Sequence, residues 1–211
     1  RRYLARIPEF KPRLRKWRLL WKRFLGKHAP EIAAMDFFTV RTLFFKPLYV
    51  FFVIHHSARK ILHFNATYHP TEDWVSNQLR SAFEYETNIK YLIMDRDACF
   101  SVKVRRTVRH MGIKVKRTSV QSPWQNGIAE RWVRTVRTEL TNRVILRTRW
   151  SAFTMLAEYI RYYNVHRPHM SLDGDTPCGG SVTPRPFPDA ALISIPVCGG
   201  LIRRYEWEKA A

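Results

Sequence analysis

The sequence predicts an α/β fold, with a mixed β-sheet flanked by helices. Three β-rich runs follow one another between residues 32 and 66 with short connections, which is typical of an antiparallel meander. After residue 70 strand and helix patterns alternate, and this alternation implies parallel strands joined by right-handed crossovers. Hydrophobic residues make up 45% of the 211-residue chain, which is enough for a sizeable core.

The first half of the chain is expected to hold three strands and one helix. The strands are predicted at residues 33–40, 48–56 and 60–66, and the helix from about 70 to 83. The first strand is an apolar run with one carboxylate, Asp36, in its middle. His55 and His56 are adjacent on a strand, so they point to opposite faces of the sheet and are not expected to bind a metal together.

The second half is expected to alternate between strands and helices before it becomes irregular. The predicted order is a strand at 89–94, a helix at 101–111, a strand at 113–116 and helices at 122–140 and 151–165. Gly112 stands where a left-handed C-terminal helix cap is expected. Residues 170–190 are rich in Pro and Gly and are interpreted as a linker, followed by a short strand at 192–197.

The stretch from Ser122 to Arg134 has the pattern of a helix start. Ser122 is the expected N-cap, Pro123 takes the first helical position, and Gln125 could close a capping box. Apolar residues then recur every four positions, at Ile128, Trp132, Val136 and Leu140. Glu130 lies off this stripe among arginines, where it is either a surface ion-pair partner or a functional carboxylate.

The charge of the chain points to a polyanionic partner. The formal net charge is +20 and the pI is near 10.5, which favours nucleic acid over a membrane surface. Residues 1–27 hold eleven Lys or Arg against a single acid, with an amphipathic helix expected around 14–25. We interpret this segment as a phosphate-contacting arm; the alternatives are a linker from a missing domain and a solvated terminus.

Three widely spaced cysteines without a CxxC pair do not form a zinc site, and they suggest a reducing compartment. The most apolar run is too short to span a bilayer, and no signal peptide is visible, so we expect a cytoplasmic, nucleoid-associated protein. The first residue is not Met, which is consistent with a fragment of a longer protein.

Three carboxylates are candidate metal ligands. Asp36 lies in an apolar strand, Asp95 follows the end of another strand, and Glu130 lies on a helix. Taken singly, they could be a satisfied structural Asp, a turn Asp and a surface ion-pair partner. Together they are hard oxygen ligands of the kind Mg²⁺ prefers. Two such ions ~3.5–4 Å apart would serve an in-line phosphoryl displacement.

Several motifs resemble the integrase catalytic core of DDE transposases, of the insertion-sequence and retroviral-integrase type. They are Met35-Asp36-Phe37, the run from Met94 to Phe100, the run from Ser122 to Arg131, and the downstream Tyr163-Asn164-x-x-Arg167-Pro168-His169. The resemblance covers about residues 30–178. Where many members of this family have Asp-Asn-Gly, this chain has Asp95-Arg96-Asp97, so Asp97 is an alternative ligand, although the register with Phe100 favours Asp95.

The resemblance implies a ribonuclease-H-like fold, with a five-stranded mixed sheet of three antiparallel strands followed by parallel ones. It implies that Asp36, Asp95 and Glu130 are the catalytic residues and bind Mg²⁺ or Mn²⁺, as two ions. The implied activity is DNA cleavage and strand transfer by direct transesterification, on element ends and target DNA, by a homo-oligomer. The alternatives are a ribonuclease-H-like nuclease and a catalytically idle DNA-binding relative. No membrane partner or small-molecule substrate is expected.

Basic and amide side chains on both sides of the carboxylates are expected to hold the DNA backbone. The candidates are Lys114, Lys116, Arg117, Gln125, Asn126, Arg131, Arg134 and Arg137. The predicted organisation is a basic N-terminal arm or linker at 1–29, an integrase-like core at 30–170, and a linker and C-terminal tail at 171–211.

Overall fold

The computed structural model describes residues 10–43, 46–86, 88–119, 122–180 and 183–208. Its main sheet has five strands in the order β3-β2-β1-β4-β5. β1, β2 and β3 form the predicted antiparallel meander, while β4 pairs in parallel with β1 and with β5. The strands are β1 Ile32–Arg41, β2 Pro47–His55, β3 Ile61–Thr67, β4 Tyr91–Met94 and β5 Lys114–Arg117.

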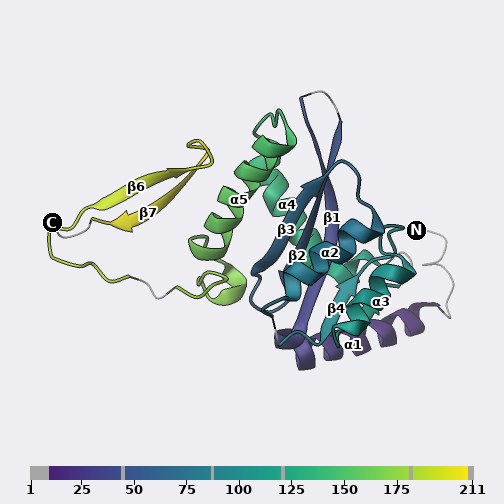
Figure 1. The fold of residues 1–211 in the computed structure, drawn as a ribbon. Coiled ribbons are helices and arrows are strands. Elements are labelled where there is room, and N and C mark those ends of the chain that lie inside the picture. Colours follow the sequence, from purple (N-terminus) through teal and green to yellow (C-terminus); the bar gives the residue numbers. More distant parts are fainter. Residues whose placement is uncertain (1–9, 44–45, 87, 120–121, 181–182, 209–211) are drawn as a thin grey trace.

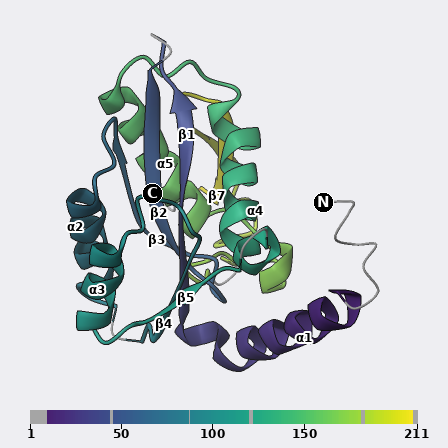
Figure 2. The same cartoon turned by 90° about the vertical axis from the view of Figure 1, so that its right-hand side faces the viewer.

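Helices cover both faces of this sheet (Figures 1 and 2). One face carries α2 and α3, and the other carries α4 and α5. Because side chains alternate along a strand, Ala33 and Met35 of β1 pack on the α2–α3 side, whereas Ala34 and Phe38 pack on the α4–α5 side. The helices are α2 Glu72–Phe83, α3 Val102–His110, α4 Gly127–Val136 and α5 Arg149–Val165.

The helix ends follow the local sequence signals. Thr71 caps α2 by accepting from the backbone N of Trp74, and Ser101 caps α3. α3 ends before Gly112, whose φ of +77° is the left-handed conformation predicted for this glycine. α5 begins at a capping box between Thr148 and Ser151. The predicted ranges of these three helices agree with the observed ones to within two residues at each end.

The start of α4 differs from the prediction. Pro123–Asn126 form a 3₁₀ turn, and the α-helix begins at Gly127. The capping box with Gln125 is wrong. The backbone N of Ser122, which that box would satisfy, already donates to the carbonyl of Ser119. The Gln125 Oε1 instead accepts from the backbone N of Ser119. The amide thus closes the preceding loop.

The basic N-terminal segment contains a longer helix than predicted, α1 Phe10–His28, and its C-terminal half docks on the sheet edge. The ring of Phe24 meets that of Tyr91 edge-on, with centroids 5.1 Å apart. A 3₁₀ turn, Ala29–Glu31, leads into β1, and Glu31 forms ion pairs with Lys90 and His28.

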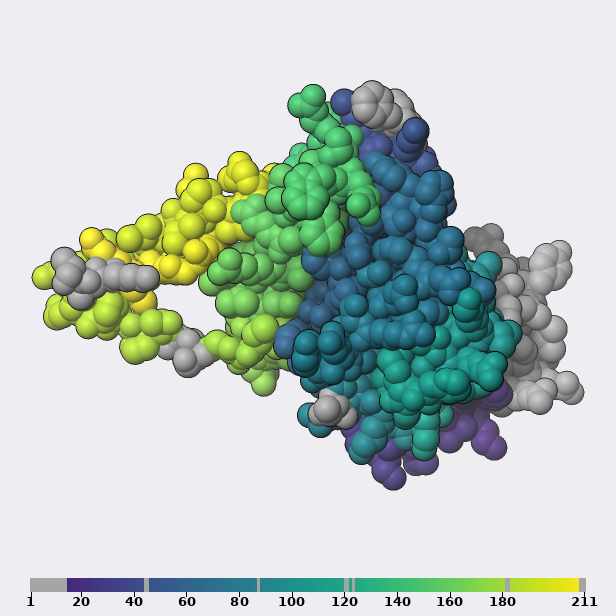
Figure 3. Space-filling view, in the orientation of Figure 1, coloured from purple at the N-terminus to yellow at the C-terminus, as the bar shows by residue number. Residues whose placement is uncertain are grey.

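Beyond α5 the chain forms a hairpin of β6 Leu192–Val197 and β7 Ile202–Trp207. β6 was predicted, but β7 was not, because a strand with exposed Arg203 and Tyr205 lacks a clear apolar face. The hairpin stands out from the body in Figures 1 and 3. Its turn touches α5, where the backbone N of Cys198 donates to Glu158 at 2.8 Å.

Within these described residues, no helix is long and apolar enough to cross a membrane.

Candidate active site

Asp36 lies half-buried in the middle of β1, on the side of the sheet that α4 and α5 cover. The backbone N of Phe37 donates to its Oδ1 at 2.8 Å. Burial raises the pKa of Asp36 to about 7, and the negative charges of Asp95, Glu130 and Asp97 push in the same direction. The three carboxylates predicted from the sequence are therefore electrostatic neighbours, with Asp36 at their centre.

Asp95 follows β4 directly, and the strand pairing explains why it lies beside Asp36. Ala34 of β1 pairs with Ile93 of β4, so Asp36 and Asp95 each stand two residues beyond the same pair. The backbone N of Asp97 donates to the Asp95 Oδ1 at 2.9 Å. Burial raises the pKa of Asp95, and the charge of Asp97 adds to this, whereas Arg117 opposes it.

Asp97 is exposed, and its Oδ1 accepts from the backbone N of Cys99 at 2.8 Å. It therefore shapes the turn after β4 as well as adding negative charge near Asp36. Both Asp95 and Asp97 remain candidate ligands, with Asp95 the more buried of the two.

Glu130 lies in the first turn of α4 and is exposed. The opposite side of the helix is held against the sheet by Trp132, which packs on Phe52 and Phe38 with ring centroids 4.2 and 5.6 Å away. In the part of the chain that the structure describes, no ion pair joins Glu130 to Arg131, Arg134 or Arg137. The role of Glu130 as a functional carboxylate stays a prediction.

The donor set has the chemistry that a hard divalent cation prefers, because all its candidate ligands are carboxylate oxygens. Burial raises the pKa of Asp36, the charges of Asp95 and Glu130 add to this rise, and a bound cation would offset both effects. Among the described residues, however, no three His, Cys, Asp or Glu side chains form a group that could hold a metal ion as they stand. The residue types therefore suit a divalent metal ion. Metal binding would require the carboxylate groups to come closer to one another.

The predicted DNA-binding residues on β5 have different surroundings. Arg117 is exposed, and the charge of Asp95 acts on it, as do Arg105 and Arg96. Lys116 instead lies over the rings of Phe24 and Tyr91, 5.1 and 5.5 Å from their centroids. Lys114 is exposed at the start of the strand. Of these three, Arg117 is next to the acidic site and Lys116 holds α1.

Gln125 and Asn126 are each only 5% exposed and bond to their own chain. The Asn126 Nδ2 donates to the carbonyl of Met35 at 3.2 Å, one residue before Asp36. This bond fixes the first turn of α4 against β1. Arg131, Arg134 and Arg137, by contrast, are exposed along α4 and the turn that follows it.

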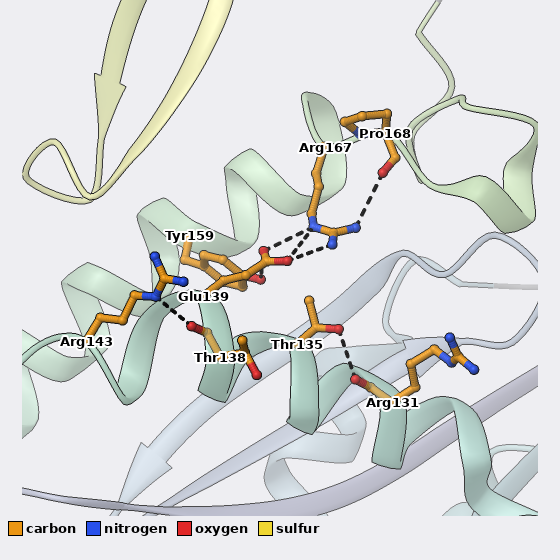
Figure 4. A network of polar contacts seen from close by, with 8 residues as sticks. All are labelled: Arg131, Thr135, Thr138, Glu139, Arg143, Tyr159, Arg167 and Pro168. Atoms are coloured by element: carbon orange, nitrogen blue, oxygen red, sulfur yellow. Dashed lines mark hydrogen bonds and ion pairs between the residues drawn. The ribbon is translucent and has the colours of Figure 1, made fainter.

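A polar network that the sequence did not reveal joins the end of α4 to the end of α5 (Figure 4). After Val136 the helix continues as a π-helical turn, Arg137–Thr141. Within it Glu139 accepts from the guanidinium of Arg167 at 2.7 Å and from the hydroxyl of Tyr159 at 2.8 Å. Only the Arg167-Pro168-His169 motif pointed to this region, and no local pattern linked it to Glu139.

Comparison with protein families places the match in the second half of the chain. Residues 111–177 match the family model described as integrase core domain. Over 86 residues the chain is 31% identical to the putative transposase InsD of insertion element IS2E and to the transposase InsD of IS2A/D/F/H/I/K, both of Escherichia coli. Each match covers 40% of this chain, but only 39% and 29% of the respective relatives. The chain thus spans well under half the length of these relatives.

Among solved structures, the catalytic core domain of BIV integrase matches with a TM-score of 0.56 at 16% identity, over 71% of this chain and 91% of that one. A chain of the simian T-cell lymphotropic virus intasome, in complex with a PP2A regulatory subunit, matches with a TM-score of 0.60 at 12% identity, over 85% of this chain and 67% of that one. The fold is therefore ribonuclease-H-like, as predicted. The comparisons confirm the resemblance to an integrase or transposase catalytic core that the sequence motifs indicated.

Proposed function

We propose that this chain is the catalytic part of a DNA transposase or integrase, which cleaves DNA and joins a 3′-hydroxyl to target DNA. The observation that carries this is the group of Asp36, Asp95 and Glu130: burial raises the pKa of Asp36, and the charges of Asp95 and Glu130 raise it further. Ion pairing that only stabilises the fold does not explain this group of acids. Like charges held close together destabilise the folded state, so such a group is expected where it serves a functional site. The InsD transposases and the integrase core model support the same reading.

Asp36, Asp95 and Glu130 would hold Mg²⁺ or Mn²⁺, which when bound supplies activation of the attacking oxygen and neutralisation of the leaving one. The strands contribute rigidity: Asp36 is fixed by the amide of Phe37 and Asp95 by that of Asp97. The Asn126 bond to Met35 holds α4, and with it Glu130, against β1. The chain thus presents its acids from three elements that pack on one another.

The DNA backbone would lie across the exposed basic residues around the acids, namely Arg117, Arg134 and Arg137. Such contacts position a duplex without reading its sequence. The partners we propose are element ends and target DNA, held by an oligomer of this chain. The matching simian T-cell lymphotropic virus chain belongs to an intasome, and we extend such an assembly to this chain as part of the proposal.

A strand-transfer assay with labelled DNA ends tests the proposal. We expect Asp95→Asn to abolish Mg²⁺-dependent joining while DNA binding, measured by fluorescence anisotropy, is kept. Asp97→Asn is the matched control: it removes a charge two residues away, and we expect it to retain most of the activity. Full joining by Asp95→Asn would overturn the assignment of Asp95, and loss with Asp97→Asn alone would move the ligand to Asp97.

The same preparation decides between DNA joining and nuclease action. An RNA–DNA hybrid and a DNA end are offered in parallel, with Mg²⁺. Cleavage of the hybrid without any DNA joining would replace the proposal with a ribonuclease-H-like nuclease. Binding without cleavage of either would indicate an idle relative.

A further inference from the structure

A cavity of about 810 Å³ lies beside the start of α4, on the α4–α5 side of the sheet. The end of α5, the turn between β2 and β3, and Leu25 of α1 form its other walls. Its volume is within the ~300–1,000 Å³ typical of ligand sites. The carboxylates Asp36, Asp95 and Glu130 do not line it, so it is separate from the acidic site.

Polar atoms without a partner are concentrated in this cavity. Across the described residues, seven buried side-chain polar atoms have no hydrogen-bond partner, and five belong to residues that line it. They are His56 Nδ1, Arg59 Nε, Asn126 Oδ1, Trp132 Nε1 and His169 Nε2. Asn126 and Trp132 are 5% and 1% exposed. Leaving buried polar atoms unbonded costs ~1–3 kcal/mol each, so a ligand that bonds them is favoured.

The charge of the cavity favours an anion. None of its described lining residues is Asp or Glu, while Arg59, Arg131 and Arg167 all line it. Arg167 is neutralised by Glu139, and Figure 4 shows it above Arg131 and Thr135 of α4. Arg59 and Arg131 have no such ion-pair partner in the described structure, and burial, with the nearby charge of Arg131, lowers the pKa of Arg59.

The rest of the lining favours a ligand with a flat, apolar part. Trp124, Trp132 and Tyr163 contribute aromatic rings, and Ile54 and Ile93 contribute aliphatic surface from the sheet. The Arg18 guanidinium of α1 lies over the Trp124 ring, 5.4 Å from its centroid, so a base would stack on Trp124 beside Arg18 or in its place. A base that stacks on an aromatic side chain contributes ~1–3 kcal/mol of binding. A nucleotide has both a phosphate, which the arginines can bind, and a base, which can stack on the aromatic rings.

The cavity is also close to the acidic site along the chain. Asn126 lines it through its unbonded Oδ1, while its Nδ2 bonds the carbonyl of Met35, next to Asp36. Glu130 lies one helical turn further along α4. Asn126 therefore links the cavity wall to the strand that carries Asp36, and we infer that a DNA strand held at the carboxylates can reach the cavity.

We propose that this cavity binds a nucleoside phosphate, supplied by one unpaired nucleotide of the DNA strand in the acidic site. Arg59 and Arg131 hold its phosphate, and Trp124 stacks on its base. The inference rests on the proposed action on DNA, because that action brings the strand to the site. A free mononucleotide has the same chemistry, and the test separates the two sources.

Binding is measured by fluorescence anisotropy in EDTA, so that no cleavage occurs. Three duplexes of one sequence are compared: blunt, with a three-nucleotide 3′ overhang, and with the same overhang made of abasic residues. We expect the base-bearing overhang to bind about tenfold more tightly than the abasic one. Arg59→Gln should weaken the binding of both overhang duplexes about tenfold, relative to its effect on the blunt duplex. Trp124→Ala should remove the preference for bases.

Arg80→Gln is the matched control, because Arg80 is an exposed arginine on α2 outside the cavity, and it should leave all three affinities unchanged. Circular dichroism and thermal unfolding establish that each variant is folded. Thymidine monophosphate is also added as a competitor of the overhang duplex. If it competes in the wild type but not in Arg59→Gln, the cavity is supported, with a free nucleotide as its ligand. Equal overhang preference in wild type, Arg59→Gln and Trp124→Ala, or no preference in the wild type, would overturn the proposal.

These outcomes are independent of the strand-transfer test. A chain that joins DNA but shows no overhang preference would disprove the nucleotide cavity alone. A chain that fails to join DNA but retains a preference sensitive to Arg59→Gln would disprove the proposed reaction and keep the cavity.

Discussion

Asp36 combines burial with like charges on neighbouring residues, and each of these factors favours its neutral form. Its pKa rises from 3.8 to about 7 in the folded chain. A carboxyl with a raised pKa binds more protons folded than unfolded, so the folded state loses stability as pH rises between these values. Ionisation of Asp36 near neutral pH therefore lowers the stability of the folded chain, and a bound cation would offset this cost.

We expect Asp36→Asn to raise the free energy of unfolding at pH 8 by about 1–3 kcal/mol in EDTA, after allowance for solvent screening. At about pH 3 the variant and the wild type should be equally stable, because Asp36 is then protonated in both the folded and the unfolded state. Urea unfolding at the two pH values measures this difference.

Asp189→Asn is the control, since Asp189 is exposed in the C-terminal segment. Addition of Mg²⁺ at pH 8 should raise the melting temperature of the wild type and leave that of Asp36→Asn unchanged. A pH-independent difference between Asp36→Asn and wild type would contradict the raised pKa.

At the scale of elements, the sequence specified much of what positions the acids. The apolar run around Asp36 predicted β1, and the stripe of Ile128, Trp132, Val136 and Leu140 predicted the buried side of α4, where Ile128 is only partly buried. The partly buried pairing of Glu139 with Arg167 could not be predicted, because they lie 28 positions apart in the chain and neither belongs to a repeating pattern. β7 was missed for a related reason, since its two faces differ little in polarity.

The cavity beside α4 could not be predicted from the sequence either. His56 and Arg59 come from a turn, and only the packing of that turn against α4 and the end of α5 gives them a common wall. Arg59 has a φ of +61°, a conformation that non-glycine residues seldom adopt and that no sequence pattern announces. Local patterns thus predict strands, helices and caps, whereas contacts between distant segments depend on how these elements pack.

The π-helical turn and α5 are expected to depend on Glu139. Glu139→Gln keeps an acceptor for the hydroxyl of Tyr159 but removes the charge that Arg167 faces. Both side chains of the pair are about one-quarter exposed, so we expect a loss of about 1–3 kcal/mol in the free energy of unfolding, measured in urea.

Tyr159→Phe should cost less, about 1 kcal/mol, because it removes one neutral donor from a buried ring. The double variant shows whether the two bonds act together. Additive losses would mean that Glu139 bonds Arg167 and Tyr159 independently. A loss below 0.5 kcal/mol for Glu139→Gln, within the spread of surface changes, would contradict a structural role for the network.

For the whole molecule, the formal net charge of +20 makes binding to DNA depend on salt. Arg134 and Arg137 are exposed and follow Glu130 by one and about two helical turns, whereas Lys116 is engaged with Phe24 and Tyr91. If Arg134 and Arg137 each contact one phosphate, each contributes about 0.9 to the slope of log affinity against log salt concentration.

The double variant Arg134→Gln and Arg137→Gln should therefore reduce the magnitude of that slope by about 2, on any duplex sequence. Anisotropy titrations between 50 and 200 mM salt, roughly the range over which such contacts weaken, provide the measurement. Arg80→Gln, on the far α2 side, is the control and should leave the slope as it is. An unchanged slope in the double variant would place the DNA elsewhere on the surface, because a loss of phosphate contacts must appear as fewer counterions released.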